Sequence, residues 1–164
     1  MAESQRPKAE AAQQLGGARF LIVQARFYDA IGADLLAGAQ RALTKAGATF
    51  DVISVPGALE LALAAAIAVD EGKRLRRPYR GIVALGCIIR GETYHFEIVA
   101  NESARALTDL AINLRMPLGN GVLTVEDEAQ AQMRADPAKG DKGGDAARAA
   151  VALHLLQAGG GRRS

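Results

Sequence analysis

The chain has 164 residues, enough for one domain with a sizeable core and too few for two ordinary domains. Its formal net charge of +2, with 23% charged residues, excludes the strongly basic field of a general nucleic-acid binder. The single cysteine, Cys87, has no intramolecular disulfide partner, which favours a reducing compartment. No segment has the apolar core of a signal peptide or the length of a membrane span, so we expect a cytoplasmic protein.

Both ends of the chain are poor in bulky apolar residues. Residues 1–17 are rich in Ala and Gln, and residues 159–164 contain only Gly, Arg and Ser. Such compositions predict flexible tails. We therefore expect a single folded domain over residues 18–158.

Strand-like and helical patterns alternate within that domain. A short apolar run over 18–25 predicts a strand, and apolar or small residues spaced three to four apart over 31–46 predict a helix. The pattern repeats with a strand over 49–55 and a helix over 58–72. Both predicted helices end near a glycine, as helices commonly do.

The third unit contains the most apolar strand of the sequence. A basic loop over 73–80, which we interpret as a solvated turn, precedes it. Residues 81–89, GIVALGCII, show no polar alternation, so this strand should be buried on both faces of a parallel sheet. A helix from about His95 to Asn113 follows.

The fourth unit predicts a strand over 118–125 and a helix to about Arg134, with Thr124 and Asp127 spaced as in a capping box. Residues 136–144 interrupt this helix before another begins. Four strand–helix units with right-handed crossovers predict an α/β fold, a three-layer α/β/α sandwich with a four-stranded parallel sheet.

Ligands in such sheets bind beyond the carboxyl ends of the strands. This rule selects four segments: RFYDAIG at 26–32, PGALE at 56–60, RGETYH at 90–95 and TVEDE at 124–128.

His95 is the most suggestive residue of these segments. With an ordinary pKa of about 6.5, an imidazole at the start of a helix suits general acid–base catalysis at neutral pH. A local hydrogen bond near the helix terminus explains the residue equally well, and position alone leaves both interpretations open. The second histidine, His154, lies among Ala and Leu, where packing is favoured.

Other polar and aromatic residues also allow two interpretations. Thr93 either caps the helix or helps the helix terminus to bind phosphate, for which Arg134 and Lys142 offer cations. Phe27 either stacks on a flat ring or packs in the core. Glu60 either accepts hydrogen bonds from a ring N–H or is an acid favoured by the helix dipole.

Several site types are missing from the sequence. It contains neither a P-loop nor a G-x-G-x-x-G motif after the first strand, and no acidic pair there for magnesium. Two distant histidines and one cysteine make a poor metal site. We therefore expect a site without metal or cofactor that works by positioning and proton transfer.

Five segments between Arg19 and Gln157 together resemble one family, lumazine synthase, a transferase of riboflavin biosynthesis. In chain order they are RFYDAI, VPGALELALAA, GCIIRGETYHFEIVANESA, NGVLTVEDEAQA and DKGGDAARAAVAL. The resemblance implies a flavodoxin-like sandwich and the condensation of 5-amino-6-(D-ribitylamino)uracil with 3,4-dihydroxy-2-butanone 4-phosphate. The product would be 6,7-dimethyl-8-ribityllumazine, formed with release of phosphate and water and without a cofactor. The alternative is a catalytically weak paralogue that binds flavin or serves assembly on the same scaffold.

The resemblance also implies roles for individual residues. His95 would transfer protons, and Phe27 would stack on the pyrimidine ring. The other implied substrate contacts are Ala58, Leu59, Glu60, Cys87, Ile88, Ile89 and Asn120, and the implied phosphate contacts are Glu92, Thr93, Arg134 and Lys142.

The family's sites lie between adjacent subunits, so a homo-oligomer is implied, with the later segments donated by the neighbour and with no nucleic-acid or membrane partner. Two positions depart from the family pattern. Glu92 stands where a small residue or Asp is common, so only its backbone N–H suits phosphate. Asn120 replaces a common aromatic residue. The turn after Arg134 is about one residue longer than in sixty-subunit shells, which favours a free pentamer.

Overall fold

The computed structural model describes residues 15–159. Its strands form one parallel sheet in the order β2-β1-β3-β4. They are β1 (Arg19–Ala25), β2 (Thr49–Val55), β3 (Gly81–Ile89) and β4 (Leu118–Val125). The predicted four-stranded parallel sheet is confirmed, and each strand agrees with its predicted range to within one residue.

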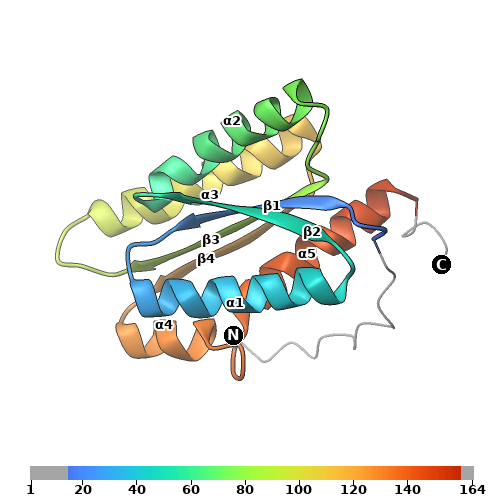
Figure 1. Ribbon diagram of the computed structural model, residues 1–164. Coiled ribbons are helices and arrows are strands. Elements are labelled where there is room, and N and C mark those ends of the chain that lie inside the picture. The colour runs from blue at the N-terminus through green and yellow to red at the C-terminus, as the bar shows by residue number, and fades with distance from the viewer. Residues whose placement is uncertain (1–14, 160–164) are drawn as a thin grey trace.

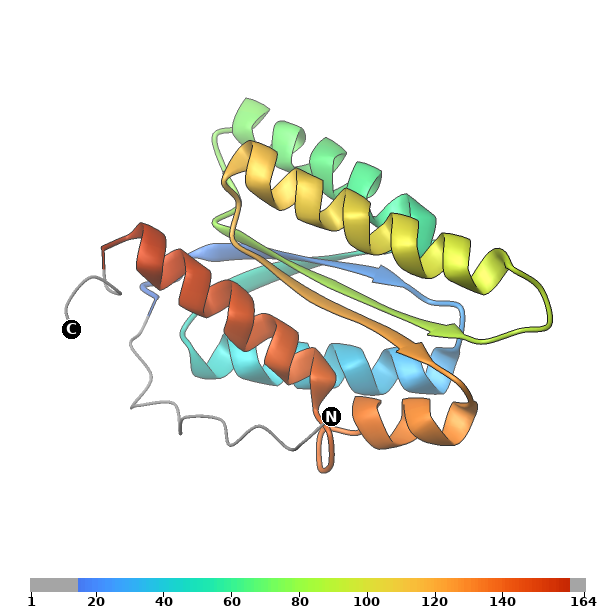
Figure 2. The same cartoon turned by 180° about the vertical axis from the view of Figure 1, so that it is seen from behind.

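Helices cover both faces of this sheet (Figures 1 and 2). One face carries α1 (Asp29–Lys45), α4 (Glu128–Ala135) and α5 (Lys142–Gln157), and the other carries α2 (Leu61–Arg74) and α3 (His95–Leu114). A 3₁₀ turn, η1 (Ala58–Glu60), precedes α2. This arrangement confirms the predicted three-layer α/β/α sandwich.

The alternation of side chains along the strands separates two apolar cores. Phe20 and Ile22 of β1 point to the face covered by α1 and α5, where they meet Leu35. Leu21 and Val23 point to the face covered by α2 and α3. The central strand β3 is fully buried from Gly81 to Gly86, as its apolar run predicts, because helices cover it on both sides.

Close packing of α1 against α5 depends on Gly143. A Cβ at this position would come within 2.0 Å of the carbonyl oxygen of Leu35, so only glycine allows the two helix backbones to approach this closely. Gly143 is buried. The Lys142–Asp145 turn of α5 is thereby held against the middle of α1.

The strand order also determines where a ligand site can form. The chain leaves β1 into α1 on one face of the sheet and leaves β3 into α3 on the other. Because β1 and β3 are neighbours, their outgoing connections diverge and open a crevice at the carboxyl ends of these two strands.

One local prediction is wrong, and another holds only in part. Thr124 does not open a capping box, because it pairs with Ile88 within the β3–β4 ladder. The residue that caps α4 is Asp127, whose Oδ1 accepts a hydrogen bond of 2.8 Å from the backbone N–H of Gln130. The loop over 73–80 is not a simple solvated turn either, because Tyr79 is buried within it.

The predicted N-terminal tail falls partly inside the described region. Leu15 packs against the first core, and its backbone N–H donates to the carbonyl oxygen of Ala46 at 2.9 Å. The remainder of the two predicted tails, residues 1–14 and 160–164, lies outside the described residues. No helix in the described part of the chain is long and apolar enough to cross a membrane.

Candidate active site

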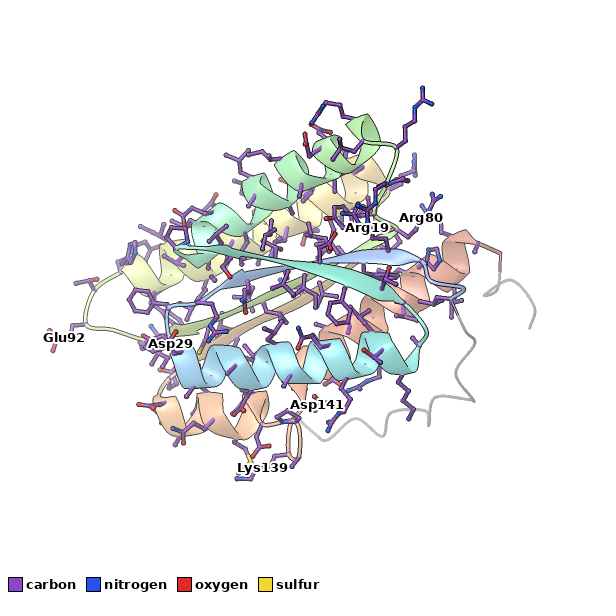
Figure 3. All side chains as sticks on the ribbon, viewed as in Figure 1. Arg19, Asp29, Arg80, Glu92, Lys139 and Asp141 are labelled. Atoms are coloured by element: carbon purple, nitrogen blue, oxygen red, sulfur yellow. The ribbon has the colours of Figure 1, made fainter. Side chains whose placement is uncertain are left out.

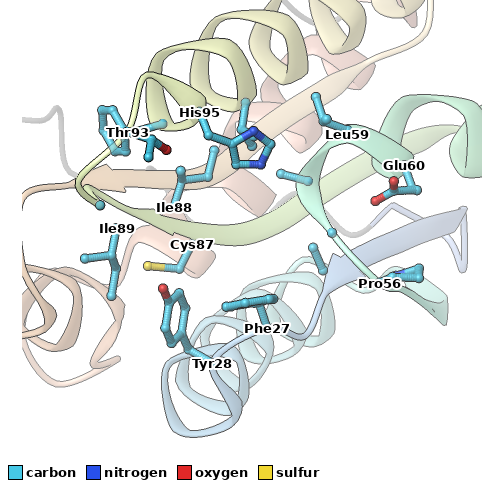
Figure 4. Close-up of a pocket in the computed structure, with 16 residues that line it drawn as sticks. Phe27, Tyr28, Pro56, Leu59, Glu60, Cys87, Ile88, Ile89, Thr93 and His95 are labelled. Carbon is cyan, nitrogen blue, oxygen red and sulfur yellow. The ribbon is translucent and has the colours of Figure 1, made fainter.

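A cavity of about 510 Å³ lies at the carboxyl edge of the sheet (Figure 4). Its walls come from the β1–α1 junction, from the segment between β2 and α2, and from the end of β3 with the start of α3. The lining consists of residues 56–60 and 87–89 together with Ala25, Phe27, Tyr28, Gly91, Thr93, His95, Phe96 and Val99.

Most of the residues that the sequence proposed for the site line this cavity. They come from three separate segments of the chain, which meet because the strands are parallel and end at the same sheet edge. These residues are Phe27, Ala58, Leu59, Glu60, Cys87, Ile88, Ile89, Thr93 and His95.

The Phe27 ring is an exposed aromatic surface inside the cavity. It is 71% exposed, and its only ring contact in the described part of the chain is an edge-to-face contact with Tyr28 at a centroid distance of 5.0 Å. Of the two interpretations of Phe27, packing in the core is therefore wrong. An aromatic ring this exposed at a cavity wall suits stacking on a planar ligand.

The His95 side chain is free to act on a ligand. It is exposed at the first residue of α3, and Figure 4 shows its ring pointing into the cavity. Within residues 15–159 it makes no hydrogen bond, so no local partner accounts for its position. An unpaired imidazole at a pocket wall can accept and donate a proton.

The hydroxyl group of Thr93 is also unengaged. The residue that precedes the first turn of α3 is Tyr94, and no side chain caps this helix. The capping role considered for Thr93 is therefore wrong. Thr93 lies beside the amino terminus of α3, whose backbone N–H groups favour anions.

Cys87 forms part of the cavity wall and does not act as a nucleophile. Its thiol is half-buried, and burial raises the pKa of this thiol to about 11. A cysteine with such a pKa stays protonated at neutral pH and is unreactive. In the described part of the chain, no three His, Cys, Asp or Glu side chains gather as metal ligands.

Four of the proposed site residues do not line the cavity of their own chain. Asn120 is exposed on the edge strand β4, and Glu92 points outward from the tip of the β3–α3 loop (Figure 3). Arg134 donates from Nη1 to the carbonyl oxygen of Gln130 at 3.1 Å. The remaining residue is Lys142, whose Nζ lies 3.4 Å from Asp145 Oδ2.

A comparison with known protein families identifies the family of this chain. Residues 17–158 match the family described as 6,7-dimethyl-8-ribityllumazine synthase. The chain belongs to the lumazine synthase family. This match covers every residue that lines the cavity and also the four proposed site residues outside it.

Curated relatives carry the same family name over nearly the full chain. A 6,7-dimethyl-8-ribityllumazine synthase of Methylocella silvestris is 64% identical over 156 residues, covering 95% of each chain. One of Beijerinckia indica is 60% identical, covering 94% of this chain and 85% of its own. One of Azorhizobium caulinodans is 55% identical, covering 96% and 97%.

Sequence reasoning missed several residues of the lumazine synthase pocket. Tyr28 and Pro56 stand beside proposed residues at the ends of strands, so the strand-end rule could have included them. Phe96 and Val99 looked like core positions of a helical stripe. They line the cavity because the start of α3 lies beside the end of β3, where the cavity forms.

Proposed function

We propose that this protein catalyses the condensation of 5-amino-6-(D-ribitylamino)uracil with 3,4-dihydroxy-2-butanone 4-phosphate to 6,7-dimethyl-8-ribityllumazine. The observation that carries the proposal is the cavity, in which a member of this family presents an exposed Phe27 ring and an unpaired His95 imidazole. These are the two groups that a reaction of a flat heterocycle by proton transfer needs.

The chemistry requires alignment and proton movement. The amine of the uracil attacks the ketone and forms an imine with loss of water, phosphate leaves, and a second condensation closes the ring. The substrates themselves supply the nucleophile and the leaving group. Holding them in register lowers the entropic cost of the bimolecular step, and a general acid–base group speeds each proton transfer.

In this proposal, each wall of the cavity contacts a different part of the substrates. The Phe27 ring stacks on the pyrimidine, and the backbone of residues 87–89 contacts its polar edge. Ala58, Leu59 and Glu60 line the place of the ribityl chain. Thr93 and the backbone N–H groups near it bind the phosphate, with Glu92 contributing only its N–H. His95 moves the protons.

A neighbouring subunit supplies the remaining contacts in this proposal. Asn120, Arg134 and Lys142 lie outside the cavity of their own chain, while the phosphate end of the cavity needs a cation. Exposed apolar side chains support a subunit contact, since Leu63 and Ile67 of α2 are 68% and 61% exposed. We assign a cytoplasmic homopentamer, with residues 18–158 as its single domain.

The central experiment mixes the purified protein with both substrates and follows the absorbance and fluorescence of the lumazine. We expect formation well above the rate of a protein-free blank, which is needed because the condensation also proceeds slowly alone. A rate equal to the blank would overturn the proposal. Riboflavin binding without turnover would identify the catalytically weak paralogue instead.

The proposal that two neighbouring subunits form each site together has a separate test. At a concentration of the phosphorylated substrate well below KM, co-expressed His95→Ala and Arg134→Ala subunits should be more active than either variant alone, because about a quarter of the interfaces in a ring pair an intact His95 face with an intact Arg134 face. Co-expression of either variant with the double variant is the control and should give no such gain. No recovery in the first mixture would place the whole site in one chain. Light scattering should show a particle of five 17.1-kDa chains.

A further inference from the structure

Arg90 joins three elements at the rim of the cavity without lining it. It is the residue directly after β3, and its backbone N–H donates to the carbonyl oxygen of Val125 at 2.9 Å. Its Nε lies 2.7 Å from Glu126 Oε2, beyond the end of β4. Its Nη1 lies 2.5 Å from Glu97 Oε1, in the first turn of α3.

The same guanidinium also stacks on a wall residue of the cavity. Its central carbon lies 4.3 Å from the centroid of the Phe96 ring, a cation–π contact. Phe96 lines the cavity and directly follows His95. Arg90 therefore contacts the first turn of α3 twice, through Glu97 and through Phe96.

The loop between Arg90 and α3 has few anchors of its own. In the described part of the chain, Glu92, Thr93 and Tyr94 make no side-chain hydrogen bond and donate no backbone N–H. All residues from Gly91 to His95 are exposed. The path of this loop thus depends on what holds its two ends, and Arg90 holds both.

Two features argue against direct binding of phosphate by Arg90. Its guanidinium is already paired with the carboxylates of Glu97 and Glu126, so an incoming anion would meet two negative charges beside one positive charge. Arg90 also does not line the cavity. Its effect on a ligand is transmitted through the residues it holds.

We propose that Arg90 is a positioning residue, which fixes the β3–α3 loop and the first turn of α3 so that Thr93 and His95 face the substrate. This inference rests on the proposed function. The contacts are exposed, with 42% of the Arg90 side chain and 58% of the Glu126 side chain accessible, so they contribute little to global stability. Their consequence is local geometry, on which catalysis depends steeply.

The first experiment compares Arg90→Gln with a matched control, a variant of Arg105 on α3. Arg105 also binds two carboxylates, those of Glu102 and Asp109, neither of which lines the cavity. Arg90→Gln should lower kcat about tenfold, within the roughly 10²-fold that a displacement of about 1 Å can cause. It should leave Tm unchanged, and Arg105→Gln should leave both unchanged. Equal kcat values for the two variants would overturn the proposal.

A double variant separates positioning from general damage. In a His95→Ala background the imidazole is already gone, so Arg90→Gln should then lower kcat by clearly less than in the wild type. A structural defect would reduce kcat by the same factor in both backgrounds, and that result would refute action through His95.

Hydrogen exchange tests whether Arg90 holds the start of α3, and it requires no measurement of turnover. The amides of Glu97 and Ile98, which donate to the carbonyl oxygen of Tyr94, should exchange faster in Arg90→Gln than in Arg105→Gln, because only the first change releases the first turn of α3. Unchanged exchange would contradict the proposal. This readout stands even if the wild-type protein shows no lumazine formation, so a failure of the proposed function is distinguishable from a failure of the positioning role.

Discussion

Two sets of polar residues at opposite ends of the sheet differ in whether they have partners within the chain. At the amino end, Arg19, Asp51 and Tyr79 bind one another. Tyr79 donates its hydroxyl to Asp51 Oδ2 at 2.8 Å, and the Arg19 guanidinium pairs with the same carboxylate and stacks on the Tyr79 ring. At the carboxyl end, Thr93 and His95 have no hydrogen-bond partner within residues 15–159. Figure 3 shows Arg19 and Glu92 at these two ends.

This difference separates stability from function. A polar group that is satisfied internally stabilises the fold and has nothing left to offer a ligand. A group left unpaired at a pocket contributes little to stability and remains available for chemistry, which is the usual compromise at active sites. Substitutions at the amino end should therefore change folding, and substitutions at the carboxyl end should change turnover.

The largest expected effect is that of His95→Ala. Loss of the proton-transfer group should lower kcat about 10²-fold, while Tm stays the same because the exposed imidazole has no partner in the described chain. Steady-state kinetics and a thermal melt measure the two quantities. An unchanged rate would remove His95 from the mechanism, and a large drop in Tm would break the separation between the two ends.

Tyr79→Phe should show the opposite pattern. Removing the hydroxyl deprives the charged Asp51 of a hydrogen bond of a type worth about 1.5–3 kcal/mol, so the free energy of unfolding should fall while kcat stays the same. Urea unfolding measures the first quantity and the lumazine assay the second. A matched fall in kcat would mean that the two ends are coupled.

Tyr79 should also make the stability of the fold depend on pH. Burial and the bond to Asp51 raise the pKa of Tyr79 to about 12, above its ordinary value of 10.0. The protonated phenol thus stabilises the fold fully below pH 10, and this contribution is lost as the pH rises from 10 to about 12. Unfolding of the wild type over this range should depend more steeply on pH than unfolding of Tyr79→Phe.

A smaller effect is expected for Arg134→Ala. The loss of one charge-assisted contact should raise KM for the phosphorylated substrate about tenfold and leave KM for the uracil substrate nearly unchanged. Steady-state kinetics with each substrate varied in turn tests this, and Lys139→Ala, on the neighbouring turn, serves as a control. Equal increases for both substrates would indicate damage to the subunit assembly rather than loss of a phosphate contact.

The smallest effect concerns His154 at the amino end. Burial, with a further contribution from Arg80, lowers the pKa of His154 below its ordinary value of 6.5, and its ring makes an edge-to-face contact with Phe20 at a centroid distance of 5.8 Å. The fold therefore favours the neutral ring, and stability should fall as the pH drops below 6.5. His154→Leu should weaken this acid sensitivity without affecting kcat. An identical acid profile would assign the sensitivity to other groups.

Much of this architecture follows from the sequence by itself. Apolar periodicity predicted all four strands and the three layers, because the burial of a strand or a helix face determines which positions must be apolar. The strand-end rule then placed Phe27 and His95 at a common edge. The motifs, which occur in family-like order, indicated the lumazine synthase family, and the family match confirms it.

Only the tertiary structure decided which of the alternative roles each residue has. Phe27 is exposed rather than packed in the core, Thr93 is free rather than capping, and Tyr79 is buried in a loop that looked solvated. The bonds of Arg90 to Glu126 and of Tyr79 to Asp51 join segments 36 and 28 positions apart. Local patterns report the burial of a face, whereas such partners depend on which distant segments the sheet order brings together.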